Sequence, residues 1–508
     1  MEHPEAVSDG GTPGGLAGKR RELEGEASTS VPSSEEGDAA VDSAGHTTAE
    51  ADLDGAAEDA DDVVEAAMRD VKVATVGNVD SGKSTLVGVL TKNILDDGRG
   101  AARSKVFNFS HEAANGRTSS IAHEIMGFSG QGDQVLSDRL GTTSAAQRNA
   151  AWQYIVSRSN KLVTFIDLCG HEKYLKTTIF GLVGLCPDYA MIIVNANAGF
   201  QKMSREHLGI ALALRIPIMF VVTKIDMAPA NVYAETMSFL QKIVKSNAVK
   251  KTALVVQGHD DLKPAAEGLA TDQISPIFCV SSVTGEGLPL LKNFLQRIPS
   301  RLHLSGLFRP LTEPAEFHIE SVYTVTGVGV CVGGIMRGGT IRANQQLWLG
   351  PDKASGFRPV LVKSIHYKRA PVEAVYSGQN CALALRLLVK KDTLRKGSFR
   401  KGMVLVDAAM DPQPVWEFKA EVIVLHHATT IREKYQAMIH CGIIRQTAQV
   451  VHMSAELLRT GDKAIVTFRF MFHAEFLHEG ATLLFREGRT KGLGRIVEAS
   501  PVSTSATA

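Results

Sequence analysis

The chain has 508 residues, 44% of them hydrophobic, and a formal net charge of +1. This length exceeds what one hydrophobic core supports, so we expect two to four domains. The sequence contains no apolar run long enough to cross a membrane and does not begin like a secretory signal, so we expect a cytoplasmic protein without a membrane partner. Its six scattered cysteines lack metal-binding spacing, which favours reduced thiols over a disulfide or zinc framework.

Residues 1–66 are rich in Ala, Gly, Ser, Glu and Asp and predict a disordered acidic tail. They hold 18 acidic and 3 basic side chains, a net charge of −15, so the remaining residues carry +16 of the chain's total of +1. A body this basic suggests a polyanionic partner, with RNA as the first candidate. A merely solvated basic surface is the alternative.

Residues 67–300 alternate short apolar runs with amphipathic stretches. The runs predict buried strands at residues 71–76, 162–166, 190–194, 216–222 and 277–280. The amphipathic stretches predict helices that include residues 84–90, 203–214, 233–245 and 288–297. This alternation predicts an α/β domain, a parallel sheet with helices on both faces.

From residue 310 the pattern changes to short alternating runs between glycines, with little helical periodicity. It predicts an all-β barrel or sandwich at residues 310–410 and a second β domain at 415–498. Pro412 and Pro414 mark the linker between them, and residues 499–508 are expected to be a disordered C-terminus.

Residues 77–84 (GNVDSGKS), the P-loop, fit the phosphate-binding pattern GxxxxGK[ST]. They lie between a predicted strand and a predicted helix, the context that this pattern requires. Backbone N–H groups of the loop would surround the phosphates, Lys83 would reach the β- and γ-phosphates, and Ser84 would bind Mg²⁺. The predicted nucleotide contacts here are Asn78, Val79, Asp80, Ser81, Gly82, Lys83, Ser84 and Thr85.

Residues 223–226 (TKID) follow a predicted strand and would select the base. The Asp226 carboxylate can accept hydrogen bonds from N1–H and N2–H₂ of guanine, and adenine offers neither donor. The stem of Lys224 can lie along one face of the base. GTPases usually place Asn where Thr223 stands, and we expect the shorter hydroxyl to lose one hydrogen bond, to the base or to the P-loop. Further base contacts are predicted from Ser281, Ser282 and Val283.

Two further segments complete the predicted site. Asp167 follows the strand at residues 162–166 and would bind Mg²⁺ through water, while the N–H of Gly170 would meet the γ-phosphate. His171, the next residue, could hold the attacking water, or it could be only a surface histidine at a helix start. Thr118, between the P-loop and Asp167, is the candidate second Mg²⁺ ligand. Hydrolysis would release the segments that these contacts hold.

In this order, the motifs resemble those of the translation-factor GTPases, the class of elongation factor Tu. Residues 77–85 look like that class's GHVDHGKTT, and residues 167–174 (DLCGHEKY) look like its DCPGHxDY. A more specific resemblance is to the subfamily called GTP-binding protein 1 and 2, and it extends over about residues 67–498. It is carried by GRTSS at 116–120, FIDLCGHEKYLKT at 165–177, VTKIDM at 222–227 and FREGRTK at 485–491.

The resemblance implies a P-loop GTPase domain followed by two β-barrels, with Mg²⁺ as cofactor. It implies catalytic roles for Lys83, Gly170 and His171, with the ribosome as activator. It also implies GTP-dependent binding of aminoacyl-tRNA, ribosome quality control and exosome-linked mRNA turnover, and we expect a monomer. One departure stands out, because elongation factors enclose the catalytic histidine between two apolar residues. Val79 supplies the first, but Arg117 occupies the second position.

Two basic clusters are candidate RNA contacts, although such runs are usually solvated faces. They comprise Arg386, Lys390, Lys391, Arg395, Lys396, Arg400 and Lys401, and then Arg486, Arg489, Lys491 and Arg495. Two alternative functions stay open. One is a GTP-dependent scaffold that recruits RNA-decay machinery, and the other is the GTPase subunit of a sulfate adenylyltransferase.

Overall fold

The structure is a computed structural model that describes residues 69–138, 144–301, 308–388, 396–400, 402–488 and 490–501. The chain divides into a unit at Met1–Gly55 and a unit at Ala56–Ala508, and every described residue belongs to the second. The acidic tail predicted at residues 1–66 therefore lies outside the described residues.

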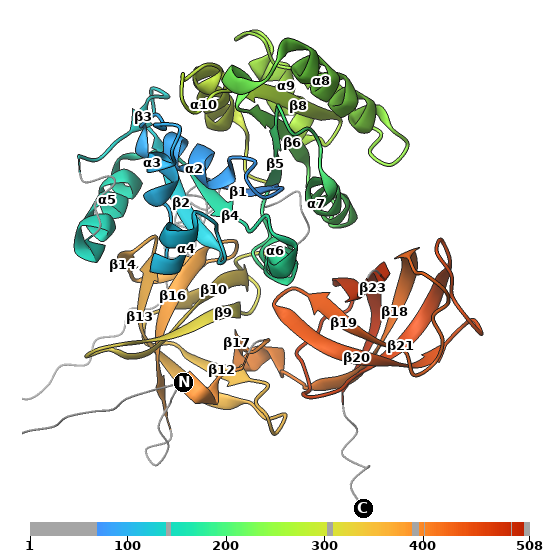
Figure 1. Cartoon of the computed structure of the whole chain (residues 1–508). Coiled ribbons are helices and arrows are strands. Elements are labelled where there is room, and N and C mark those ends of the chain that lie inside the picture. The colour runs from blue at the N-terminus through green and yellow to red at the C-terminus, as the bar shows by residue number, and fades with distance from the viewer. Residues whose placement is uncertain are drawn as a thin grey trace, which may run out of the picture. The chain divides into compact units, whose positions relative to one another are not determined.

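The first domain is built on an eight-stranded sheet in the order β3-β2-β4-β1-β5-β6-β8-β7 (Figure 1). Its strands are β1 (Asp70–Gly77), β2 (Ala122–Phe128), β3 (Gln134–Val135), β4 (Lys161–Asp167), β5 (Tyr189–Asn195), β6 (Ile218–Thr223), β7 (Thr252–Val255) and β8 (Ile274–Val280). The strands from β4 to β7 in this order run parallel, whereas β2 pairs antiparallel with β4. The predicted parallel sheet is thus confirmed, with an antiparallel extension at one edge.

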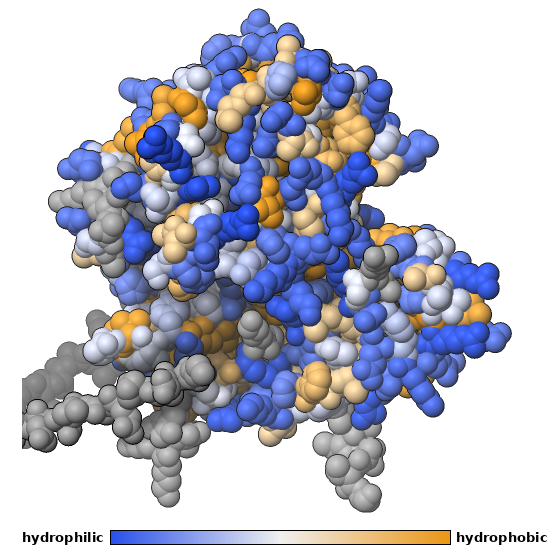
Figure 2. Space-filling view, viewed as in Figure 1, coloured by the Kyte–Doolittle hydropathy of each residue, from blue (hydrophilic) through white to orange (hydrophobic). Residues whose placement is uncertain are grey.

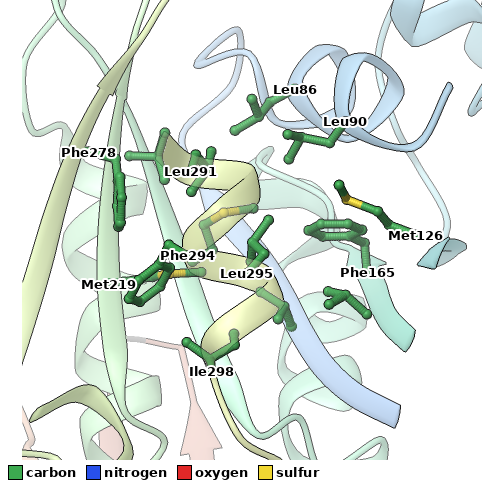
Figure 3. Packing of buried hydrophobic residues seen from close by; sticks show 14 of the residues in the cluster. Leu86, Leu90, Met126, Phe165, Met219, Phe278, Leu291, Phe294, Leu295 and Ile298 are labelled. Carbon is green, nitrogen blue, oxygen red and sulfur yellow. The ribbon is translucent and has the colours of Figure 1, made fainter. Parts of the chain in front are cut away.

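Helices cover both faces of this sheet, as predicted. They are α2 (Lys83–Lys92), α3 (Ala101–Ser104), α4 (Ser110–Asn115), α5 (Ala145–Arg158), α6 (Leu175–Gly184), α7 (Lys202–Ala213), α8 (Ala230–Lys245), α9 (Leu262–Ala270) and α10 (Leu288–Arg297). Successive residues of β1 alternate between two cores, because side chains of a strand point to opposite faces. Val73 joins the core under α2, α9 and α10, and Ala74 joins the core under α6, α7 and α8. In the first core, drawn in Figure 3, the rings of Phe278 and Phe294 lie 4.7 Å apart.

The second domain is a closed ring of six strands. They are β9 (Glu316–Val325), β10 (Gly329–Gly338), β12 (Gln346–Gly350), β13 (Arg358–Tyr367), β16 (Asn380–Leu387) and β17 (Val404–Val406). The ring closes because β12 pairs with both β13 and β17. The short strand β14 (Ala370–Val372) extends this sheet beside β13, and β11 (Thr340–Arg342) and β15 (Ala374–Tyr376) pair with each other in a separate two-stranded sheet.

The third domain is a closed barrel in the order β18-β21-β20-β19-β22-β23. Its strands are β18 (Val415–His426), β19 (Gln436–Cys441), β20 (Ile444–Met453), β21 (Lys463–Phe470), β22 (Thr482–Glu487) and β23 (Thr490–Pro501). The predicted pair of all-β barrels is confirmed. Strand β23 runs three residues past the expected boundary at 498, because Val415 at the start of β18 still pairs with Pro501.

Both barrels contact the first domain through charged side chains. In the turn between β13 and β14, the Lys368 ammonium lies 2.8 Å from the carboxylate of Asp70 on β1. Lys491 on β23 donates to Glu206 on α7 at 2.6 Å. In the described part of the chain, no helix combines the length and apolar character needed to span a membrane. Hydrophilic residues predominate on the face drawn in Figure 2, and all six cysteines are free.

Candidate nucleotide-binding site

The P-loop joins β1 to α2 and bends sharply. Asp80 and Gly82 adopt left-handed backbone conformations, with φ of 57° and 88°. A Cβ atom at Gly82 would lie 3.4 Å from the Thr223 hydroxyl, an ordinary contact, so glycine is favoured there by the left-handed backbone and not by a lack of space. A cavity beside the loop is lined by Val79, Asp80, Gly82, Lys83, Ser84, Thr85, Arg103, Gly116, Arg117, Thr118, Gly170 and His171. Asn78 and Ser81 line an adjoining cavity.

Lys83 is the buried cation of this site, with only 7% of the residue exposed. Its ammonium donates to the Asn78 carbonyl at 2.7 Å, across the P-loop. Burial lowers the pKa of Lys83, while the nearby charge of Asp167 opposes that shift. An ammonium held over the loop in this way is placed to meet an anion that the loop surrounds.

The three predicted metal ligands converge from three separate segments. The Ser84 hydroxyl lies 2.6 Å from the Thr118 hydroxyl and donates at 2.6 Å to one carboxylate oxygen of Asp167. The other oxygen of Asp167 is buried and has no hydrogen-bond partner among the described residues. Burial raises the pKa of this carboxyl to about 6. Two hydroxyls beside a buried carboxylate with an unused oxygen form a donor set that fits Mg²⁺.

Gly170 and His171 lie on the other side of the cavity. A Cβ atom at Gly170 would come within 2.7 Å of the Asn78 carbonyl oxygen and closer still to the Lys83 ammonium, so only glycine fits there. His171 is exposed, and its Nδ1 accepts from the backbone N–H of Lys173 at 3.1 Å, at the start of the 3₁₀ turn Glu172–Tyr174. The histidine therefore both begins a helical turn and lines the cavity.

Arg117 does not form the second side of an apolar enclosure around His171. Its guanidinium lies 3.7 Å from the Asp80 carboxylate of the P-loop, and both side chains are more than half exposed. An exposed ion pair of this kind contributes little stability. Arg117 thus sits at the cavity rim, bridging the segment at 116–120 to the P-loop.

The segments predicted to bind the base follow neighbouring parallel strands, since Thr223 of β6 pairs with Val280 of β8. The Thr223 hydroxyl donates to the Ser81 carbonyl of the P-loop at 2.8 Å. Thr223 therefore keeps its hydrogen bond to the P-loop. If a bond is lost relative to Asn at this position, it is the bond to the base. Lys224 adopts a left-handed conformation and directs the chain into the short turn that carries Asp226, which is exposed.

The three residues of the last segment, 281–283, differ in burial and in hydrogen bonding. The buried Ser281 hydroxyl accepts from the backbone N–H of Val283 at 3.2 Å and of Thr284 at 3.0 Å, so it shapes the turn. The Ser282 carbonyl accepts from the N–H of Asp96, and Val283 is 40% exposed. The turn leaves Val283, like Asp226, at the surface.

Sequence reasoning missed His207 on α7, which is fully buried. Its Nδ1 accepts from the backbone N–H of Gly77 at 3.2 Å and so holds the first residue of the P-loop. Burial first, and then the charge of Lys83, lower the pKa of this imidazole to about 3, so the ring is neutral. No local motif marks this residue, because it lies 130 positions from its partner.

Several of the candidate RNA contacts pair with acidic side chains of the same chain. Arg400 bonds Glu475 at 2.6 Å, and Arg486 and Lys491 both face Glu206. Arg386 and Lys396 are exposed, and Arg495 donates to the Gly480 carbonyl. Lys390, Lys391, Arg395, Lys401 and Arg489 lie outside the described residues.

Comparison with known proteins agrees with this geometry. The family described as "Elongation factor Tu GTP binding domain" matches residues 68–300. The chain is 49% identical to GTP-binding protein 1 of Xenopus laevis over 84% of its length, and spans 63% of that protein. It is 42% identical to human GTP-binding protein 2 over 85% of its length, covering 70% of that protein.

A solved structure shares the fold at low sequence identity. Translation elongation factor SelB of Methanococcus maripaludis, in complex with a GTP analogue, superposes with a TM-score of 0.59 at 17% identity. The superposition covers 86% of this chain and 80% of that one, so the likeness extends over the first domain and into the barrels.

Proposed function

This chain belongs to the GTP-binding protein 1 and 2 family of elongation-factor-Tu-like GTPases, and we propose that it hydrolyses GTP to GDP and phosphate as a switch on ribosomes. One observation carries the proposal: the hydroxyls of Ser84 and Thr118 and the buried Asp167 carboxylate meet within hydrogen-bonding distance beside Lys83. Phosphoryl transfer depends mostly on positioning and charge stabilisation, and this cluster is suited to both.

In this proposal Ser84 and Thr118 would hold Mg²⁺ directly and Asp167 would hold it through water. When bound, the ion neutralises charge on the phosphate oxygens. Lys83 binds the β- and γ-phosphates, and the N–H of Gly170 donates to the γ-phosphate. The contacts of Thr118 to the ion and of Gly170 to the γ-phosphate would exist only while the γ-phosphate is present, and its loss would remove that hold on their segments.

His171 orients the attacking water. Its Nδ1 is occupied as the acceptor for the Lys173 N–H, and this bond requires the tautomer that carries its proton on Nε2. Nε2–H is then a donor that can fix a water oxygen opposite the γ-phosphate. The histidine acts by placing the water, which suits a reaction that asks little proton transfer of the enzyme.

The test compares GTP turnover with and without purified ribosomes, for wild type and His171→Ala. Wild type should be stimulated by ribosomes, while His171→Ala should bind GTP and GDP normally but lose stimulated turnover by at least about 10²-fold. Stimulated turnover within about threefold of wild type would contradict the role of His171.

We further propose that the cargo is aminoacyl-tRNA, and that the protein works as a monomer in the cytoplasm in elongation or ribosome quality control. Support comes from the +16 charge outside the acidic tail and from the elongation factors among its structural relatives. Protection of aminoacyl-tRNA from deacylation by the GTP form, and not by the GDP form, tests this. No protection in either form would instead favour a scaffold for RNA decay.

A further inference from the structure

Glu112 is a buried carboxylate close to the site that the proposed mechanism does not use. It lies in α4, just before the segment at 116–120 that carries Thr118, and only 1% of the residue is exposed. Burying a carboxylate costs free energy unless donors surround it. Its position therefore calls for a compensating set of hydrogen bonds.

The donors come mainly from the two residues that follow Thr118. One carboxylate oxygen of Glu112 accepts from the backbone N–H of Ser119 at 2.7 Å and of Ser120 at 2.9 Å. The same oxygen accepts from the two serine hydroxyls at 2.8 and 3.0 Å. The other oxygen accepts from the N–H of Asn108 at 3.1 Å. Burial raises the pKa of this carboxyl, but the hydrogen bonds outweigh it and lower the pKa below its ordinary value.

These bonds act directly on the backbone of Thr118. The N–H of Ser119 belongs to the peptide plane that joins it to Thr118, so a bond to Glu112 fixes that plane. The Thr118 hydroxyl itself lies 2.6 Å from that of Ser84. Glu112 thus holds the backbone that follows Thr118, while the Thr118 hydroxyl contacts Ser84 in α2.

We infer that Glu112 is a positioning residue that holds Thr118 in the geometry in which it binds Mg²⁺ and senses the γ-phosphate. The inference rests on the proposed function. It also explains why two serines follow Thr118, since each supplies both a backbone and a hydroxyl donor to the one carboxylate. Ser119 and Ser120 then serve as anchors, and Thr118 alone faces the metal.

The expected signature is a selective one. Thr118 is used only in the triphosphate state, so loosening it should weaken the binding of a GTP analogue and leave GDP binding nearly intact. Glu112→Gln keeps the shape but turns one acceptor into a donor facing other donors, and hydrogen bonds to a charged group are strong ones. We expect affinity for non-hydrolysable GppNHp to fall about tenfold or more, with GDP affinity within about threefold.

The experiment uses the full chain and titrates GppNHp and GDP by equilibrium binding at several Mg²⁺ concentrations. The half-saturating Mg²⁺ concentration for GppNHp binding should rise in Glu112→Gln. Glu267→Gln, which changes an exposed glutamate on α9, is the matched control and should behave as wild type. If Glu112→Gln does not fold, Ser120→Ala removes one hydroxyl donor and should give a smaller change in the same direction.

Equal weakening of GppNHp and GDP would assign Glu112 a merely structural role and overturn the inference, as would unchanged binding of both. None of these measurements uses ribosomes. A failure of ribosome-stimulated turnover would therefore count against the proposed function and leave this result standing.

Discussion

The phosphate side and the base side of the site are built in different ways. On the phosphate side, Asp167 is 1% exposed and accepts from Ser84 of another segment, and Lys83 is 7% exposed and donates to Asn78 within the P-loop. On the base side, Asp226 is exposed and Val283 is 40% exposed. A buried charge cannot lose its partners cheaply, whereas an exposed one remains solvated without them. The fold thus positions the phosphate- and metal-binding side chains in advance, whereas Asp226 and Val283, which are predicted to bind the base, remain at the surface.

The largest expected effect is the removal of the buried cation. Lys83→Ala takes away a positive charge that favours the ionised Asp167 carboxylate, and it removes the donor that faces the phosphates. We expect affinity for both GTP and GDP to fall by about 10²–10³-fold, measured by titration with a fluorescent nucleotide. Lys202→Ala, which removes an exposed lysine paired with Glu172, is the control and should leave affinity unchanged. A loss below about tenfold for Lys83→Ala would show that nucleotide affinity does not depend on the buried cation of the phosphate side.

The next effect tests the base side. Asp226→Asn replaces an acceptor of two guanine N–H groups with a group that presents one acceptor and one donor. GTP affinity should fall by about 10–100-fold, while a xanthine nucleotide, which has a carbonyl in place of the guanine amino group, should bind better than to wild type. Competition between the two nucleotides measures this. Unchanged preference would show that Asp226 does not select the base.

Features that depend on neighbouring residues could be predicted from the sequence, whereas features that depend on distant partners could not. The buried strands of the first sheet were found because apolar residues predominate in each, even where a polar residue such as Lys72 or Thr164 stands among them. Strand β2 was missed because His123 and Glu124 interrupt its pattern, and Glu124 is compensated by Lys92 from α2. The compensation is visible only once the chain is folded.

The site divides similarly. The P-loop and the DLCGH segment are each an unbroken stretch of sequence, so their roles could be predicted from the sequence alone. The Thr223–Ser81 bond joins residues 142 positions apart, and sequence reasoning put that bond in doubt. Glu112 is only seven positions from Ser119, but the short helix that aims it was not predicted.

The last prediction concerns the pH dependence of stability, to which the buried His207 on the phosphate side contributes. The pKa of His207 is lowered from 6.5 to about 3, so the unfolded chain binds a proton that the folded protein excludes. Its contribution to stability is complete above about pH 6.5 and is lost as pH falls toward 3, at up to about 1.4 kcal/mol per pH unit. His207→Gln keeps an acceptor for the Gly77 N–H but cannot titrate. Between pH 7 and 5 the melting temperature of wild type should therefore fall more steeply than that of His207→Gln, whereas His452→Gln, at an exposed histidine, should follow wild type. Parallel curves for wild type and His207→Gln would show that burial of the neutral His207 ring does not lower stability in acid. The contact between His207 and Gly77 would then hold the P-loop less firmly than the burial of the ring implies.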